Sequence, residues 1–189
     1  MRRWLPLVLA ALLALTLLPG LSAVDALDER ESRDMVTAYE STNHHDWLSP
    51  VYSHEPFFDK PLPGYALEAI AIRVLQRGWP ADQRATREVA VSRLVRALLA
   101  AGLALAVAQI GIQLFGVRAG WLAGIALATM AGLPLAARTD GVQVYTTLLT
   151  WLGLGRLLAV LAGRTRTRGA TLVLGWLTLG AAANTGGIL

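Results

Sequence analysis

The sequence contains no cysteine, a single lysine and few charged residues of any kind. Without cysteine the chain cannot form disulfides or cysteine-type zinc sites, although this says nothing about its redox compartment. Charged residues make up 16% of the 189 residues, against about 25% in a typical soluble domain, whereas 54% are hydrophobic. This balance favours a membrane protein. The net charge of +4 is therefore no argument for binding nucleic acid, and we expect no nucleic-acid partner.

Five apolar stretches each have about the 20 residues that a helix needs to cross the hydrocarbon core of a bilayer. Lipid offers no hydrogen-bond partners, so each stretch must be a helix. The stretches cover residues 4–24, 94–115, 119–137, 142–162 and 170–189. A soluble helical bundle would need polar faces, which these stretches lack. The sequence therefore predicts an all-α integral membrane protein, a bundle of about five transmembrane helices.

The first stretch has two interpretations. Its basic start, apolar run and small-residue end also describe a cleaved secretory signal. The run is long for a signal and four more spans follow, so we expect a retained helix. The predicted organisation is then a first transmembrane helix (1–24), a long extracytoplasmic loop (25–93) and a transmembrane bundle (94–189).

Acidic residues are absent from one side of this predicted bundle. The N-terminus and the segments after the second and fourth spans carry only arginine, which marks them as cytoplasmic. All but one of the 13 acids lie in 25–93, and the remaining one, Asp140, falls between the third and fourth spans. Counting crossings places Asp140 on the same side as 25–93. Every carboxylate is thus predicted to face the extracytoplasmic compartment.

The extracytoplasmic loop is expected to contain juxtamembrane helices. Asp28 and Glu31 have the spacing of a capping box, which predicts a short helix through about Glu40. Apolar positions within 65–77 predict a helix along the membrane surface, and the next helix begins near Arg87 and enters the second span. The histidines at 44, 45 and 54 have no established ligand spacing, so we interpret them as loop residues and assign no metal site.

Several short motifs occur in a set order along the chain. An acidic "DE" follows the first span, and then come "WLSP", "FFDKP", an arginine entering the second span, "FGVRAGWLAGIALA" and "RTD" before the fourth span. This order resembles the N-terminal part of the polyprenyl-phosphate-sugar-dependent glycosyltransferases with the GT-C fold. The nearest group is the family 39 type, which includes aminoarabinose transferases and protein O-mannosyltransferases. No single motif is specific, but their order and spacing together are.

The resemblance implies an activity and a set of site residues. The activity is transfer of a sugar from a polyprenyl-phosphate donor to a lipid or protein acceptor, at the extracytoplasmic face of a bacterial inner membrane. The cofactor stays unknown, with a divalent metal as one option. The implied roles are catalytic for Asp28 and Asp140, donor-phosphate binding for Lys60 and Arg93, and supporting for Glu29 and Asp59.

The chemistry of these residue types suits such a reaction, but each has a simpler alternative. Lys60 offers a compact positive charge for a phosphate, or it is an interfacial lysine that extends its amine to water. Asp28 could act as a general base toward a hydroxyl acceptor, or cap a helix. Asp140 could hold the acceptor or a cation, or cap the fourth span. The sequence leaves these alternatives open.

The chain also departs from the pattern it resembles. The family usually has a Thr-Lys-Gly element after its fifth helix, and "ANTGGIL" lacks the lysine. Family members run to several hundred residues with more helices, so we expect this chain to be a fragment. A non-catalytic membrane subunit, or an inactive truncated remnant, is therefore the competing interpretation.

Overall fold

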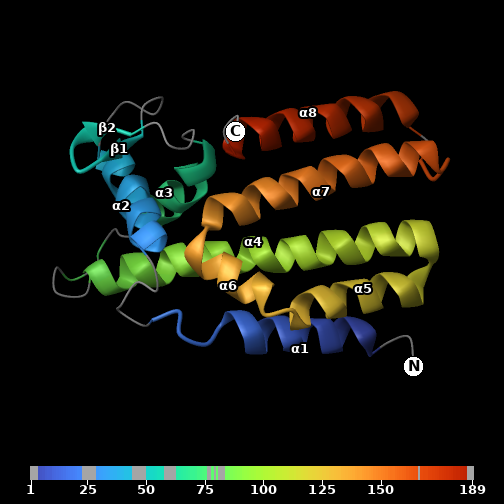
Figure 1. The fold of residues 1–189 in the computed structure, drawn as a ribbon, viewed down its shortest axis with the longest axis horizontal. Coiled ribbons are helices and arrows are strands. Elements are labelled where there is room, and N and C mark those ends of the chain that lie inside the picture. Colours follow the sequence, from blue (N-terminus) through green and yellow to red (C-terminus); the bar gives the residue numbers. More distant parts are fainter. Residues whose placement is uncertain are drawn as a thin grey trace.

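The structure is a computed structural model that describes residues 4–22, 29–43, 50–57, 63–75, 78, 80, 84–165 and 167–186. Its apolar helices form one elongated bundle. They are α1 (Leu5–Leu17), α4 (Arg84–Phe115), α5 (Val117–Thr129), α6 (Gly132–Thr139), α7 (Gly141–Leu161) and α8 (Arg168–Gly186). The remaining elements gather at one end of the bundle (Figure 1). They are α2 (Glu29–Asn43), β1 (Val51–Tyr52), β2 (Glu55–Pro56) and α3 (Pro63–Leu75).

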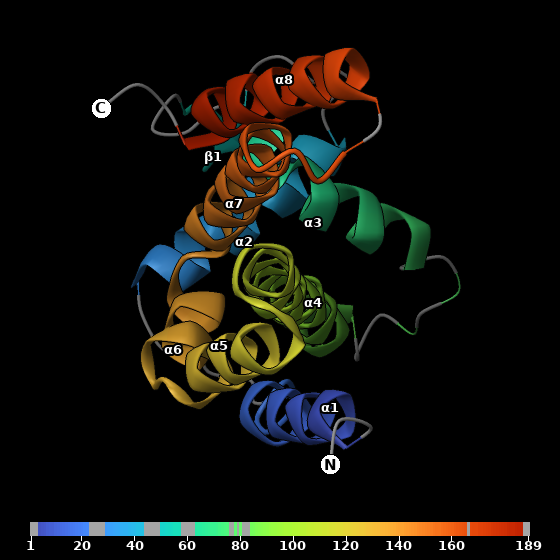
Figure 2. The ribbon, with the colours of Figure 1, turned by 90° about the vertical axis from the view of Figure 1, so that its right-hand side faces the viewer.

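The long helices follow one another across the bundle in the order α8, α7, α4, α5 and α1 (Figure 2). Helix α4 runs away from the end that carries α2 and α3, α5 and α6 return toward it, and α7 runs away again (Figure 1). The chain turns between α4 and α5 at Gly116. The backbone φ of this residue is 94°, a value that residues other than glycine rarely adopt. Asp140, between α6 and α7, therefore lies at the same end of the bundle as α2 and α3.

The core is lined largely by small side chains. Ala100, Ala104 and Ala108 on α4 are buried at four-residue spacing, which lets the neighbouring helices approach closely. Leu9 and Leu13 of α1 pack into the same core. By contrast, large apolar side chains such as Leu98 and Trp176 point outward and are 64% and 65% exposed. An apolar exterior around a small-residue core confirms the predicted all-α membrane bundle.

The five predicted spans all coincide with helices, but these helices differ in length and continuity. By length and composition, the described helices α7 and α4 (from Thr86) can each cross a membrane. The pair α5 and α6 adds a third crossing if it counts as one span, although it is bent by 58°. Helix α1 has 13 residues and is shorter than the span expected from 4–24, and α8, predicted as the fifth span, is not among the described helices that meet this standard of length and apolarity.

The bend between α5 and α6 has a local cause. Pro134 has no amide hydrogen, and its ring would clash with the carbonyl four residues earlier, at Met130, if the helix continued. Met130 instead has extended backbone (φ −71°, ψ 126°), and a new helix starts at Gly132 with Pro134 in its first turn. The apolar run over 119–137 predicted one uninterrupted helix, and the structure corrects this to two.

The juxtamembrane helices agree with their predictions. Helix α2 ends three residues beyond Glu40, and α4 begins at Arg84, within one turn of Arg87. Helix α3 has two apolar faces: Tyr65 and Ile72 are buried against the protein, whereas Ile70 and Val74 are 51% and 63% exposed. An exposed apolar stripe of this kind suits a helix that lies along a membrane surface.

Candidate functional site

Six polar side chains are buried together where α2 and α3 meet the start of α4. We call this group the ion cluster, and it consists of Glu31, Asp34, Glu68, Ser92, Arg93 and Arg96. Each is at most 3% exposed. Buried charges must be paired to be tolerated, so the contacts within this group explain how it can exist.

Arg93 is held by an acidic residue of the first loop. Its Nε lies 2.7 Å from Glu31 Oε1 and its Nη2 lies 3.3 Å from Oε2, so both carboxylate oxygens face the guanidinium. Its Nη1 donates to the carbonyl of Gly20 at 3.1 Å. Arg93 thus joins α4 to α2 and to the turn that follows α1.

Arg96 makes the second pair of the ion cluster. Its Nε and Nη2 lie 2.7 and 2.9 Å from the two carboxylate oxygens of Glu68, and Ser92 also donates to that carboxylate. Its Nη1 donates to the carbonyl of Arg138 at 3.2 Å. Asp34 and Glu31 add attractive electrostatic interactions with the same guanidinium. Arg96 therefore connects α3 and α4 to the end of α6, two residues before Asp140.

The junction between α6 and α7 is packed directly against this pair. A Cβ on Gly141 would lie 2.6 Å from Arg96 Nε and 2.7 Å from Glu68 Oε1, so only glycine fits here without displacing them. Asp140, the preceding residue, accepts a hydrogen bond from the Gln143 amide at 3.0 Å and caps α7. The capping role considered for Asp140 is thus realised. It does not exclude a role in the reaction, because the same carboxylate lines a cavity.

This cavity, the Asp140 pocket, has a volume of about 430 Å³. Thr139, Gln143 and Thr147 supply polar groups beside Asp140, while leucines of α4, α5 and α6 supply apolar walls. Pockets for small molecules commonly measure about 300–1,000 Å³ and combine an apolar lining with a few polar groups. The Asp140 pocket is therefore large enough, and mixed enough in polarity, for part of an amphipathic ligand.

The remaining predicted site residues are only partly covered. Asp28, Asp59 and Lys60 lie outside the described residues. Glu29 is described, and its Oε1 lies 2.9 Å from Arg33 Nη2 in an exposed pair along α2. The structure thus brings Arg93 and Asp140 to the same end of the bundle, and all six roles stay predictions.

A short hairpin precedes Lys60 in the sequence. Strands β1 and β2 are antiparallel, and the turn residues Ser53 and His54 both have positive φ, as tight hairpins favour. Phe57 follows the hairpin, with the Arg33 guanidinium 5.9 Å from its ring centroid. The His54 amide donates to Glu40 at 3.1 Å. These contacts fix the hairpin on α2, although its sequence was predicted only as loop.

Histidine and acidic side chains are the groups of this chain that could ligate a metal ion. Among the residues that the structure describes, no three histidine, cysteine or acidic side chains are grouped as a metal site would require. His54 is exposed, and His44 and His45 lie outside the described ranges.

Sequence reasoning missed most of the ion cluster, although a signal was present. Glu68 shares the 65, 68, 69, 72 spacing of the buried face of α3, and this spacing places it among Tyr65 and Ile72. Ser92 and Arg96 are four residues apart on α4, so they share one face. An acid on the buried face of one helix and an arginine on the next predict a buried pair.

Taken together, the fold and its polar end define a class: a polytopic helical membrane protein with a juxtamembrane ion cluster and an adjoining pocket at one end. No family model matches the chain, and no curated protein matches it significantly. Among solved structures, the chain is similar to ArnT from Cupriavidus metallidurans in the apo state, with a TM-score of 0.75 and 20% sequence identity. The match covers 98% of this chain but 33% of ArnT.

At this level of identity the likeness shows the fold. The chain has a fold shared with part of ArnT, which is a glycosyltransferase with the GT-C fold. This confirms the resemblance to the N-terminal part of a GT-C glycosyltransferase that the motif order had indicated. The chain spans about a third of the length of ArnT, so activity, substrate and partners are matters for proposal.

Proposed function

We propose that the chain forms the donor-side part of a membrane glycosyltransferase, which transfers a sugar from a polyprenyl-phosphate carrier on the extracytoplasmic face. The observation that carries this proposal is the Asp140 pocket, located beside the ion cluster in a fold shared with ArnT. A lipid-linked sugar has an apolar chain and a polar head. The pocket offers leucine walls on one side and Asp140, Gln143 and threonines on the other.

The proposed roles are those that the resemblance implies, and the chemistry of each residue type suits its role. Lys60 meets the donor phosphate, because a lysine is a compact cation that binds phosphate well. Asp28 acts as general base toward a hydroxyl acceptor, supported by Glu29 and Asp59, and Asp140 holds the acceptor at the pocket. The acceptor is a lipid or a protein. The membrane is the bacterial inner membrane.

The hydrogen bonds that Arg93 already makes limit how it could contact the donor phosphate. Two of its nitrogens face Glu31 and the third donates to the Gly20 carbonyl. To contact the donor phosphate directly, Arg93 would exchange the Gly20 carbonyl for a phosphate oxygen and keep the Glu31 pair. In either arrangement it holds α2 against α4.

The first test is binding of a long-chain polyprenyl phosphate to the purified chain, measured by native mass spectrometry and thermal shift. Losing a charge-assisted hydrogen bond costs roughly 1.5–3 kcal/mol, so Lys60→Ala is expected to weaken binding by about one to two decades. Lys60→Arg should rescue it only partly, because a planar guanidinium does not replace an ammonium. Arg118→Ala removes one positive charge from an exposed position at the opposite end and should leave binding unchanged.

The second test is transfer, measured with a radiolabelled polyprenyl-phosphate sugar in membranes containing the chain. We expect transfer to be lost in Asp28→Asn and reduced in Asp140→Asn, which keeps the capping group of α7. Binding without any transfer would favour a non-catalytic subunit or an inactive fragment. If Lys60→Ala binds the polyprenyl phosphate as tightly as the unchanged chain does, the role carried over from the resemblance is wrong.

A further inference from the structure

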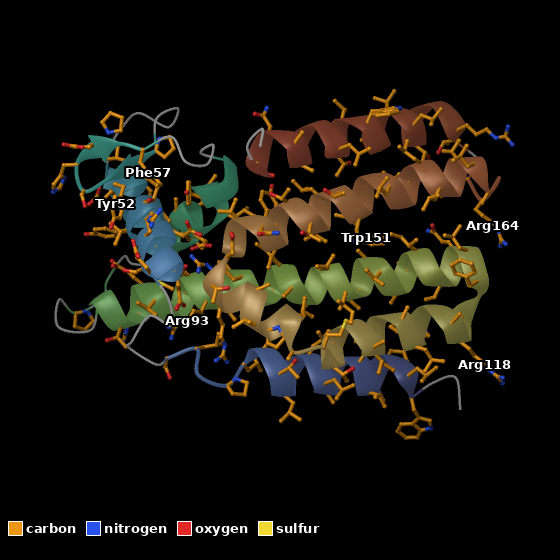
Figure 3. The ribbon with its side chains drawn as sticks, in the orientation of Figure 1. Tyr52, Phe57, Arg93, Arg118, Trp151 and Arg164 are labelled. Carbon is orange, nitrogen blue, oxygen red and sulfur yellow. The ribbon has the colours of Figure 1, made fainter. Side chains whose placement is uncertain are left out.

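A second polar cavity lies toward the opposite end of the bundle, between α4 and α7. We call it the basic pocket; its volume is about 410 Å³. Its polar lining comes from Gln109, Gln113, Arg156, Arg164, Thr165 and Thr171. Figure 3 shows Arg164 and Arg118 at one end of the molecule and Arg93 at the other. The basic pocket is therefore separate from the ion cluster and from the Asp140 pocket.

The charge of this pocket is not balanced by acids of its own helices. The sequence has no acid between 89 and 139 and none after Asp140. The described acids belong to α2, the hairpin, α3, the first turns of α4 and the α6–α7 junction. Nη1 of Arg156 donates to the Leu152 carbonyl at 3.0 Å and to the Thr178 hydroxyl at 3.5 Å, and both acceptors are neutral. An anion would complete this site.

The depth of the pocket indicates what kind of anion fits. Arg156 lies five residues before the end of α7, about 8 Å along the helix axis. Arg164 is in the exposed loop beyond that end. Farther toward the middle of the bundle the lining becomes apolar, with Ala106, Leu152 and the indole of Trp151. Polarity thus falls with depth, as it does along a phospholipid from its phosphate to its acyl chains.

We propose that the basic pocket binds the phosphate group of an anionic phospholipid, from the leaflet at this arginine-rich end. Arg156 and Arg164 contact the phosphate oxygens, Gln113 contacts the head group, and Trp151 packs against the upper part of an acyl chain. Arginine forks match phosphate geometry, and basic pockets between membrane helices suit anionic head groups. The site is independent of the proposed transfer reaction, because it lies at the other end of the bundle.

The close packing of α4 and α7 gives this site a defined shape. A Cβ on Gly155 would lie 2.7 Å from Ile110 Cγ1, so the two helices touch directly beside Arg156. Thr165 and Thr171 are hydrogen-bonded at 3.1 Å and join the loop to α8. These contacts hold α4, α7 and α8 together around the pocket.

The experiment compares three probes on the full chain in detergent: phosphatidylglycerol, phosphatidylcholine with the same acyl chains, and inorganic phosphate. Bound lipid is counted by native mass spectrometry and stabilisation is measured by thermal unfolding. We expect binding and stabilisation by phosphatidylglycerol alone. Phosphatidylcholine carries the same phosphate beside a positive choline, so equal effects of this zwitterionic lipid would overturn the assignment to an anionic phospholipid. An equal effect of inorganic phosphate at the same concentration would overturn the lipid assignment.

Substitutions of the pocket arginines test whether phosphatidylglycerol binds at the basic pocket. Arg156→Gln and Arg164→Gln should each weaken phosphatidylglycerol binding about fivefold, the effect typical of one basic residue near an anionic membrane surface. Arg118→Gln is the matched control, since it removes the same charge at the same end outside the pocket. Arg164 is in an exposed loop, so its variant tests the site even if Arg156→Gln fails to fold. Unchanged binding in Arg164→Gln, or an equal loss in Arg118→Gln, would refute the proposal.

Discussion

The two ends of the bundle use charge in opposite ways. At one end, Arg93 and Arg96 are buried and each faces both oxygens of a carboxylate, in contacts as short as 2.7 Å. At the other end, Arg118 and Arg164 are exposed, and no acid occurs nearby in the sequence. The same residue type therefore has a structural role at one end and remains available to lipid head groups or water at the other.

This difference explains how a chain with so few charges organises its polar end. The ion cluster connects α2, α3 and α4, which are separate in sequence, and through the Arg138 carbonyl it reaches the junction that carries Asp140. Apolar packing alone would orient these juxtamembrane helices weakly, because one side of α3 faces outward. Paired charges fix their orientation and, through the Arg138 carbonyl, hold the junction that carries Asp140.

The largest expected effect is an all-or-none difference in membrane sidedness. A reporter that is active only outside the cytoplasm should work when fused after Asp46 or Asp140 and be silent when fused after Arg166. The physical reason is that arginine-rich segments are retained in the cytoplasm. Reporter activity in cells measures this. Activity after only one of the two acidic positions would contradict the shared side, and would point to α5 and α6 as a re-entrant pair.

The next largest effect separates the two ends by stability. Glu68→Ala leaves the Arg96 guanidinium buried without its main partner, which should cost about 3–5 kcal/mol of unfolding free energy. Arg164→Gln, at the exposed end, should change it by less than about 0.5 kcal/mol. Chemical unfolding in detergent micelles gives both values. Similar losses in the two variants would show that the ion cluster is not the stronger structural element.

A smaller effect tests how tightly the ion cluster is packed against the α6–α7 junction. Gly141→Ala places a methyl group within 2.7 Å of Arg96 and Glu68, and should cost about 1–3 kcal/mol. Gly132→Ala, at the start of α6, is the control because no heavy atom lies within 4 Å of its added Cβ. The same unfolding measurement applies. If both variants are equally stable, the side chains of Arg96 and Glu68 can shift to accommodate the methyl group, and this pair does not position Asp140.

The positions of the helices could be predicted from the sequence, whereas the contacts between them could not. Apolar runs and caps predicted the location of every long helix, because lipid leaves a chain no other regular structure. The break at Met130 was not predicted, because Pro134 stands within an otherwise apolar run. Arg93 was assigned to the donor phosphate, a role that stays a prediction, and its pairing with Glu31 was not foreseen because Glu31 is 62 positions away and belongs to another helix. Pairings of this kind depend on how helices dock, which no local spacing encodes.

The smallest expected effect concerns Glu29, which lies beside the ion cluster in sequence but is exposed. Its pair with Arg33 spans one turn of α2, and the two side chains are 82% and 32% exposed. Water and salt screen such pairs, so Glu29→Gln should change unfolding free energy by less than about 0.5 kcal/mol. Glu31→Gln, two residues along the same helix, removes a buried partner and should cost several times more. If Glu29→Gln nonetheless weakens polyprenyl-phosphate binding or transfer, its role is functional, because stability cannot account for the loss. If it changes neither, the supporting role assigned by resemblance is wrong, and Glu29 only pairs with Arg33 on the surface of α2.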